Sequence, residues 1–290
     1  MTLAGVTFRY PGAARDALAG VSFEVAAGEI VALAGDAGAG TSTLLLVATG
    51  FAPRLVGGTL TGARRMAGRC GIVFSRPWTQ LTGLCSTVGD EVAFGPASLG
   101  LARERVLASA GRAMQRLGIT HLAVRDPAQL SGGELQRVVV ASVLALEPDL
   151  LALDDPAAEL DPAGADALYG LLPALAAGGT AIVVATPDLE RVARVATRAV
   201  VLADGRIVAD GPTHLLEGTR VAAIARVHLL DVGGIRALDG LEPRIHGVLE
   251  ESKKRPAGSV RPSPAAASRA RGRLADDRGL GTRHRKSRTE

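Results

Sequence analysis

The chain has 290 residues, 47% of them hydrophobic and 21% charged, a composition that excludes a protein disordered throughout its length. Its two cysteines, Cys70 and Cys85, are too few for a disulfide scaffold and too isolated for a metal-binding cluster. No apolar run approaches the roughly 20 residues of a membrane-spanning helix, and no secretory signal is recognised. We therefore expect a protein of the reducing cytoplasm.

Positive charge is concentrated in the last forty residues. Residues 251–290 hold 12 of the 33 Lys and Arg residues and 4 of the 29 acidic residues, although residues 1–250 are net acidic. This segment contains no Phe, Tyr or Trp and is predicted to be a disordered basic tail. A contact with nucleic acid or anionic lipid is one interpretation. Because aromatic side chains for base stacking are absent, a solvated extension is favoured, and nucleic acid is not expected as a partner.

Strand-like and helix-like segments alternate over the first 210 residues, an order typical of an α/β domain with a mostly parallel sheet. Residues 3–8 and 21–25 are predicted to form an initial antiparallel β-layer. The next predicted elements are a buried strand over residues 29–34, a helix over 41–49 and a strand over 71–74.

The middle of the chain is helical and polar. Residues 75–135 predict a helical insertion with breaks at Gly95-Pro96 and at Gly100. A strong helix over 135–146 then leads to a buried strand over 150–153 that ends in two acids. The remaining predicted elements are strands over 181–185, 199–202 and 206–209 and a helix over 188–196.

A glycine-rich turn joins the predicted strand at 29–34 to the following helix. It reads GDAGAGTST over residues 35–43, and its backbone N–H groups could surround a phosphate at the helix N-terminus. The P-loop motif is G-x-x-x-x-G-K-[ST]. Gly35, Gly40 and Ser42 match it, whereas Thr41 stands at the lysine position. The turn alone is equally consistent with a tight strand-to-helix connection.

Further motifs favour the nucleotide interpretation. Residues 130–137 read LSGGELQR and match the signature of ABC-type ATPases, and LLALDDP at 150–156 follows where their Walker B strand is expected. Ser131 and Glu134 also have the spacing of a helix capping box, which does not account for the whole octet. TVGDEVAFGP at 87–96 resembles the segment after the Q-loop in energy-coupling-factor and cobalt-type importers. The resemblance extends over about residues 3–216.

This resemblance implies a P-loop NTPase fold of the ABC type with a helical signature subdomain. It also implies ATP and Mg²⁺ as cofactors, with each nucleotide held between the glycine-rich turn of one chain and the signature of another. The implied nucleotide-binding residues are Tyr10, which would stack on adenine, Gly35, Gly38, Gly40, Thr41, Ser42 and Thr43. The implied magnesium ligands are Ser42 and Asp154. The residues implied to act on the partner's site are Ser131, Gly132, Gly133, Glu134 and, in the D-loop, Asp161.

Four positions depart from the family pattern. Thr41 replaces the lysine that meets the β- and γ-phosphates, and Asp155 replaces the catalytic glutamate with a side chain one methylene shorter. Ser75 replaces the Q-loop glutamine, although Gln80 follows five residues later, and Pro187 replaces the histidine that contacts the γ-phosphate. We therefore expect a catalytically impaired site of its own and an intact contribution to a partner's site.

The resemblance implies the ATP-binding subunit of an importer, at the inner face of the cell membrane. The expected partners are a transmembrane transport subunit and a second ABC ATPase, with a heterodimer favoured. Trp78 is interpreted either as a contact with the transport subunit or, preferentially, as a partly buried residue. The alternative function is a nucleotide-dependent regulator or nucleic-acid-associated protein. The expected organisation is an ATP-binding domain over 1–216, an accessory segment over 217–250 and the tail over 251–290.

Overall fold

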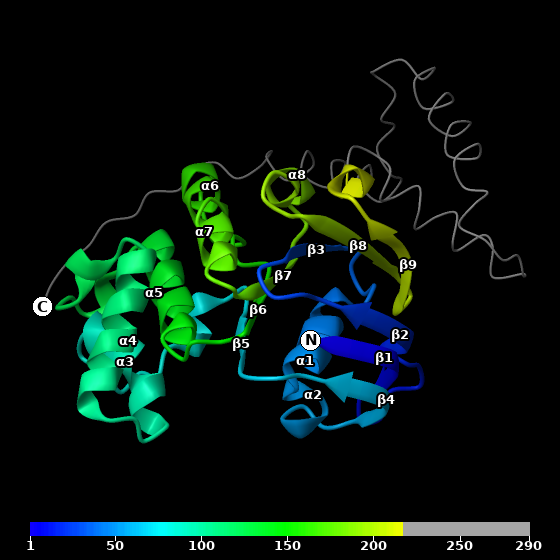
Figure 1. Cartoon of the computed structure of the whole chain (residues 1–290), viewed down its shortest axis with the longest axis horizontal. Coiled ribbons are helices and arrows are strands. Elements are labelled where there is room, and N and C mark those ends of the chain that lie inside the picture. The colour runs from blue at the N-terminus through cyan, green and yellow to red at the C-terminus, as the bar shows by residue number, and fades with distance from the viewer. Residues whose placement is uncertain (217–290) are drawn as a thin grey trace, which may run out of the picture. The chain divides into compact units, whose positions relative to one another are not determined.

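The computed structural model describes residues 1–216, so the expected accessory segment at 217–250 and basic tail at 251–290 lie outside the described residues. Two sheets organise the described chain (Figure 1). The smaller sheet is antiparallel and has the order β2-β1-β4. Its strands are β1 (Thr2–Arg9), β2 (Leu18–Glu24) and β4 (Thr59–Arg65). The predicted antiparallel layer is therefore present, and β4 is a strand that the sequence pattern did not predict.

The larger sheet has six strands in the order β5-β6-β7-β3-β8-β9. All its neighbouring strands are parallel except β8 and β9. The central strands β3 and β7 are buried along their whole length, which explains why their sequences are continuously apolar. The bounds are β3 (Ile30–Ala34), β5 (Cys70–Val73), β6 (Leu150–Asp154), β7 (Ala181–Ala185), β8 (Arg198–Ala203) and β9 (Arg206–Gly211).

The helices fall into two groups. Helices α3 (Val88–Ser98), α4 (Arg103–Arg116) and α5 (Gly132–Leu144) pack against one another as the expected helical subdomain (Figure 1). The other α-helices are α1 (Thr41–Thr49), α2 (Phe51–Arg54), α6 (Pro162–Tyr169), α7 (Leu172–Ala177) and α8 (Leu189–Ala193). Short 3-10 helices are η1 (Pro77–Gln80), η2 (Thr120–Leu122), η3 (Pro127–Gln129) and η4 (Thr213–Leu216). Within residues 1–216, no helix combines the length and apolar character required to cross a bilayer.

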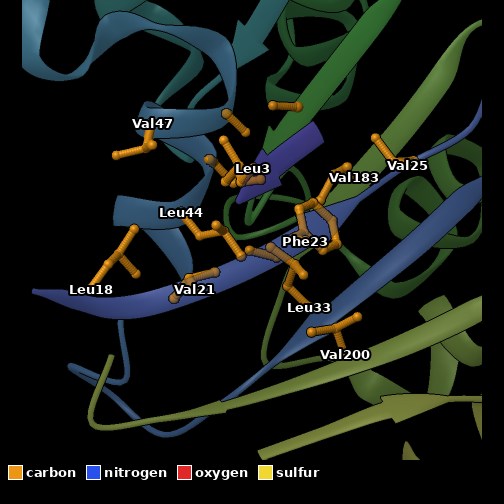
Figure 2. Packing of buried hydrophobic residues seen from close by; sticks show 14 of the residues in the cluster. Leu3, Leu18, Val21, Phe23, Val25, Leu33, Leu44, Val47, Val183 and Val200 are labelled. Atoms are coloured by element: carbon orange, nitrogen blue, oxygen red, sulfur yellow. The ribbon is translucent and has the colours of Figure 1, made fainter. Parts of the chain in front are cut away.

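One apolar core joins the two sheets through α1. Figure 2 shows Leu44 of α1 between Leu18 and Phe23 of the antiparallel layer, with Leu33 and Val183 of the larger sheet beside Phe23. Each of these five side chains is at most 3% exposed. Burying such a side chain contributes about 1.5–3 kcal/mol, so the position of α1 between the sheets is strongly determined. The glycine-rich turn precedes α1 and is therefore held by the same core.

Several sequence-based boundaries were wrong, three of them in helices of functional interest. Gly95-Pro96 does not break the helix, because α3 continues through Pro96 to Ser98 and only its last turn is affected by the missing N–H. The break at Gly100, whose φ is +71°, is confirmed. Helix α5 begins at Gly132 rather than at 135, since the Ser131 capping box already starts it. Helix α8 ends at Ala193 and is shorter than the 188–196 prediction.

Candidate nucleotide-binding site

The glycine-rich turn ends in an open helix N-terminus. Gly40 is the residue before α1 and has φ 104° and ψ 9°, a left-handed conformation that glycine adopts without strain. No side chain caps the helix at this end. The first N–H groups of α1 are therefore available to an anion, and the helix dipole favours negative charge at the same place.

Close backbone packing determines the shape of this turn. A Cβ atom on Gly40 would lie 2.8 Å from the carbonyl oxygen of Ala17, and one on Gly205 would lie 2.6 Å from the same oxygen. A Cβ on Gly35 would lie 2.8 Å from the carbonyl oxygen of Leu202. The turn is thus pressed against the segment before β2 and against the β8–β9 connection. Glycine is required here by contact as well as by backbone angle.

Ser42 and Asp154 form a pair suited to a magnesium ion. The Ser42 hydroxyl donates to Oδ1 of Asp154 over 2.9 Å, bringing the first turn of α1 to the end of β6. Burial raises the pKa of the Asp154 carboxyl, and the Ser42 hydrogen bond partly opposes this. Residues 1–216 hold no cluster of three or more His, Cys, Asp or Glu side chains able to bind a metal. Hydroxyl and carboxylate oxygens suit Mg²⁺, which commonly takes its remaining ligands from phosphates and water.

Asp155 lies beside this pair in an unusual backbone conformation. Its φ is +48°, and its N–H donates to the carbonyl oxygen of Ala185 over 2.7 Å. Its Oδ1 accepts a hydrogen bond from the Thr186 hydroxyl over 3.2 Å. Burial raises the pKa of the Asp155 carboxyl, the Thr186 bond lowers it, and the charge of Asp188 raises it further. The acid is therefore attached to the end of β7 through both its main chain and its side chain.

Thr186 is a site residue that the sequence pattern did not reveal. Its hydroxyl accepts hydrogen bonds from the Tyr169 hydroxyl and from the Asp188 N–H, each over 3.1 Å. Tyr169 is the last residue of α6 and is 2% exposed. The only feature that marks Thr186 in the sequence is its position directly after an apolar predicted strand. Nothing in the sequence pattern connects it to Tyr169.

Tyr10, which the resemblance implies as an adenine-stacking residue, lies beside the glycine-rich turn. Its hydroxyl is hydrogen-bonded to the Thr43 hydroxyl over 3.2 Å, and its ring packs edge-on against Phe8 with 4.9 Å between ring centroids. Tyr10 is half-buried, so part of its surface is open to a ligand. The aromatic ring, the turn and the Ser42–Asp154 pair therefore belong to one site.

The other two departures from the family pattern lie at strand ends. Ser75 follows β5, and Pro187 follows β7 next to Thr186. Gln80 does not replace the missing Q-loop glutamine, because its amide accepts from the Phe74 N–H over 2.7 Å and donates to the Ile72 carbonyl oxygen over 3.1 Å. Its side chain holds η1 against β5 instead.

Trp78, in η1, differs from the preferred expectation. Its side chain is 57% exposed rather than partly buried. Leu84, in the following loop, is 78% exposed, and Phe94 on α3 is 38% exposed. Single exposed apolar side chains are common on protein surfaces, and a contiguous patch of them is the feature that marks an interaction surface.

The signature forms a separate pocket. Ser131 and Glu134 make a complete capping box at the start of α5: the Ser131 N–H donates to the Glu134 carboxylate over 2.8 Å, and the Glu134 N–H donates back to the Ser131 hydroxyl. Hydrogen bonds from Ser131 lower the pKa of Glu134. Asp161 caps α6 by accepting from the Gly164 N–H over 2.7 Å. These residues, with Gly132 and Gly133, line a pocket of about 490 Å³, and none of its lining residues belongs to the glycine-rich turn.

Comparisons of the sequence with known proteins identify the family that this chain resembles. Residues 18–158 match the family model described as ABC transporter. A putative ABC transporter ATP-binding protein of Streptomyces coelicolor is 41% identical over 227 residues, covering 74% of this chain and 84% of that protein. The energy-coupling factor transporter ATP-binding protein EcfA of Methanothermobacter thermautotrophicus is 34% identical over 219 residues, covering 72% of this chain and 70% of that protein.

Solved structures agree on the fold. The structure of CbiO1 from Clostridium perfringens, described as part of the ABC transporter complex CbiONQ, is 26% identical, with a TM-score of 0.64. The match covers 86% of this chain and 98% of that chain. The predicted α/β P-loop fold with its antiparallel layer and helical subdomain is therefore confirmed, and the chain belongs to the family of ABC transporter ATP-binding proteins.

Proposed function

We propose that this chain is the ATP-binding subunit of an importer similar to the energy-coupling-factor class. In this proposal residues 1–216 form the cassette, which binds ATP with Mg²⁺ and pairs with a second, catalytically complete ABC ATPase. The names of the relatives support the transport function. The heterodimer is supported by the contrast between an incomplete turn at residues 35–43 and a complete signature at residues 130–137, and this contrast carries the proposal.

The chain's own site is proposed to bind nucleotide weakly and to hydrolyse it slowly. Thr41 offers no positive charge to the phosphates, and a charge-assisted hydrogen bond of the missing kind contributes roughly 1.5–3 kcal/mol. Asp155 is one methylene shorter than glutamate, so its carboxylate reaches less far toward an attacking water. A reacting group displaced by about 1 Å costs on the order of a hundredfold in rate. Pro187 has neither an imidazole nitrogen nor a backbone N–H to contact the γ-phosphate.

Magnesium would be held by the hydroxyl of Ser42 and the carboxylate of Asp154. Bound there, the ion would supply positive charge opposite the phosphate oxygens. The glycine-rich turn and Tyr10 would orient the phosphates and the base. These residues retain a binding function even where the groups for rapid hydrolysis are missing.

The signature pocket is proposed to receive the nucleotide bound by the partner ATPase. Ser131 is exposed at the N-terminus of α5, where the helix dipole favours phosphate. The approach is open at Gly133, because a Cβ there would meet no atom within 4 Å. Closure of the two chains around ATP would then move the exposed side chains of Trp78 and Leu84, which we propose contact the transport subunit.

Turnover by the chain alone and by the pair tests this proposal. The purified chain is expected to show negligible ATPase activity, and the chain mixed with its partner ATPase is expected to turn ATP over. Ser131→Arg should abolish that turnover by filling the signature pocket. Ser98→Arg is the matched control, since Ser98 is exposed at the end of α3 and does not line the pocket. Rapid turnover by the chain alone, or full activity of the Ser131→Arg pair, would contradict the proposal.

A further inference from the structure

The Thr186 hydroxyl is the centre of a hydrogen-bonded group behind Asp155. It contacts the Tyr169 hydroxyl and the Asp188 N–H at 3.1 Å and Oδ1 of Asp155 at 3.2 Å. Thr186 is 8% exposed and Tyr169 is 2% exposed, so water does not compete freely for these bonds. The three partners come from α6, from the end of β6 and from the segment before α8.

The donors in this group determine where the threonine proton points. A hydroxyl has one hydrogen and two acceptor lone pairs. A backbone N–H can only donate, so the Asp188 N–H occupies one lone pair, and the Tyr169 hydroxyl donates to the other. The hydrogen of Thr186 is therefore directed at Asp155. The resulting chain of donors runs from Tyr169 through Thr186 to Oδ1 of Asp155.

Two of the hydrogen-bond partners of Thr186, namely Tyr169 and Asp188, are themselves held by their surroundings. Burial raises the pKa of Tyr169 to about 12, so its hydroxyl keeps its proton at neutral pH and remains a donor. Asp188 is paired with Arg191, and Arg191 also binds Asp166 in the middle of α6 over 2.8 Å. Helix α6 thus holds the segment after β7 at two points. The charged groups that face Asp155 in this arrangement are Asp154, Asp188 and, through Asp188, Arg191.

We propose that Tyr169 is a positioning residue that acts through Thr186 to hold the Asp155 carboxylate in one orientation, with Oδ1 bound and Oδ2 open. This inference rests on the proposed ATP hydrolysis. In that reaction the water oxygen forms a bond to the γ-phosphorus, and the bond from phosphorus to the β,γ-bridging oxygen breaks with its electron pair on ADP. One proton of the water passes to Asp155, and Oδ2, the oxygen that Thr186 does not bind, is the one placed to receive it.

The orientation of Asp155 can be measured on the isolated chain without any partner. Three-bond couplings from the Asp155 carboxyl carbon, recorded by NMR on labelled protein, report whether its χ1 angle is single or averaged. The native chain is expected to show a single rotamer. Tyr169→Phe, which keeps the buried ring, and Thr186→Val, which keeps the shape, are both expected to show averaging. Thr186→Ser retains the hydroxyl and is expected to restore the single rotamer.

A spectroscopic control follows from the composition of the chain. The chain has only two tyrosines, Tyr10 and Tyr169. In a Tyr10→Phe background, Tyr169 is therefore the single source of the tyrosine Raman doublet. The intensity ratio of this doublet shows whether the tyrosine hydroxyl donates or accepts a hydrogen bond. The donor ratio should persist in Thr186→Ser and disappear in Thr186→Val. A single Asp155 rotamer in Tyr169→Phe would overturn the inference. Neither readout depends on ATP turnover, so failure of the transport proposal would be recognised separately in the mixing experiment.

Discussion

The Ser42 hydroxyl lies 2.9 Å from Oδ1 of Asp154, although the two residues are 112 positions apart. This contact joins the helix that follows the glycine-rich turn to strand β6 of the larger sheet. It places a hydroxyl and a carboxylate where a magnesium ion and phosphates would meet, next to a turn without a lysine. The balance of charge at this point therefore decides how firmly a nucleotide can be held.

Removal of magnesium is expected to weaken nucleotide binding at least tenfold, or about 1.4 kcal/mol. Thr41 supplies no charge to the phosphates, so repulsion from Asp154 and Asp155 is uncompensated without the metal. Titration of a fluorescent ATP analogue with Mg²⁺ and with EDTA measures this difference. Asp154→Asn should reduce the difference. Equal affinities in the two buffers would contradict the assignment of Ser42 and Asp154 to magnesium.

Thr41→Lys is expected to raise nucleotide affinity roughly 10- to 100-fold. One charge-assisted hydrogen bond contributes about 1.5–3 kcal/mol, and each 1.4 kcal/mol is a factor of ten. Thr41→Met is the matched control, because methionine has a comparable length and no charge. The same titration serves for both variants. An equal gain in the methionine variant would mean that side-chain length, not charge, limits binding.

Gly40→Ala is expected to destabilise the chain by on the order of 3 kcal/mol, because a left-handed φ and a contact with the Ala17 carbonyl both oppose a Cβ. Gly38→Ala is the control: its φ is +86°, but its Cβ would meet nothing within 4 Å. Its cost should be about 1 kcal/mol. Thermal unfolding should show a clearly larger decrease in Tm for Gly40→Ala. Equal decreases would show that backbone angle alone matters.

The capping box formed by Ser131 and Glu134 predicts that the free energy of unfolding depends on pH in the acid range. The pKa of Glu134 is lowered in the folded chain. Its stabilisation is therefore fully present above the unfolded value of about 4.3 and is lost as the pH falls through the lower folded value. Glu134→Gln should cost about 0.5–1 kcal/mol at neutral pH, a difference that shrinks in acid.

Unfolding of the native and Glu134→Gln chains as a function of pH measures this difference. Glu104→Gln is the control, since Glu104 lies in the first turn of α4, where no side chain caps the helix. This control loses only the helix-dipole effect of a first-turn carboxylate and should show a smaller difference from the native chain than Glu134→Gln does. A Glu134→Gln difference that stays constant through the acid range would contradict the role of the ionised carboxylate.

The short motifs of the candidate site could be located in the sequence, because they stand at the ends of apolar strands. The resemblance to ABC-type ATPases implies that Ser42 and Asp154 lie together, and the parallel sheet explains their contact, because the carboxyl ends of its strands meet at one edge. The contact between Tyr169 and Thr186 is not predictable, because it depends on how α6 packs. The exposure of Trp78 is not predictable either, since the burial of a lone aromatic residue depends on its tertiary neighbours.

Gly40 packs closely against the Ala17 carbonyl oxygen, and this packing fixes the backbone of the glycine-rich turn. The curvature of the turn is imposed by main-chain neighbours, so it survives whichever side chain follows at position 41. If the proposed function is right, threonine in place of the family's lysine removes a positive charge and leaves the backbone shape of the turn unchanged. A substitution that adds a charge at position 41 would then act on a turn whose backbone is already formed.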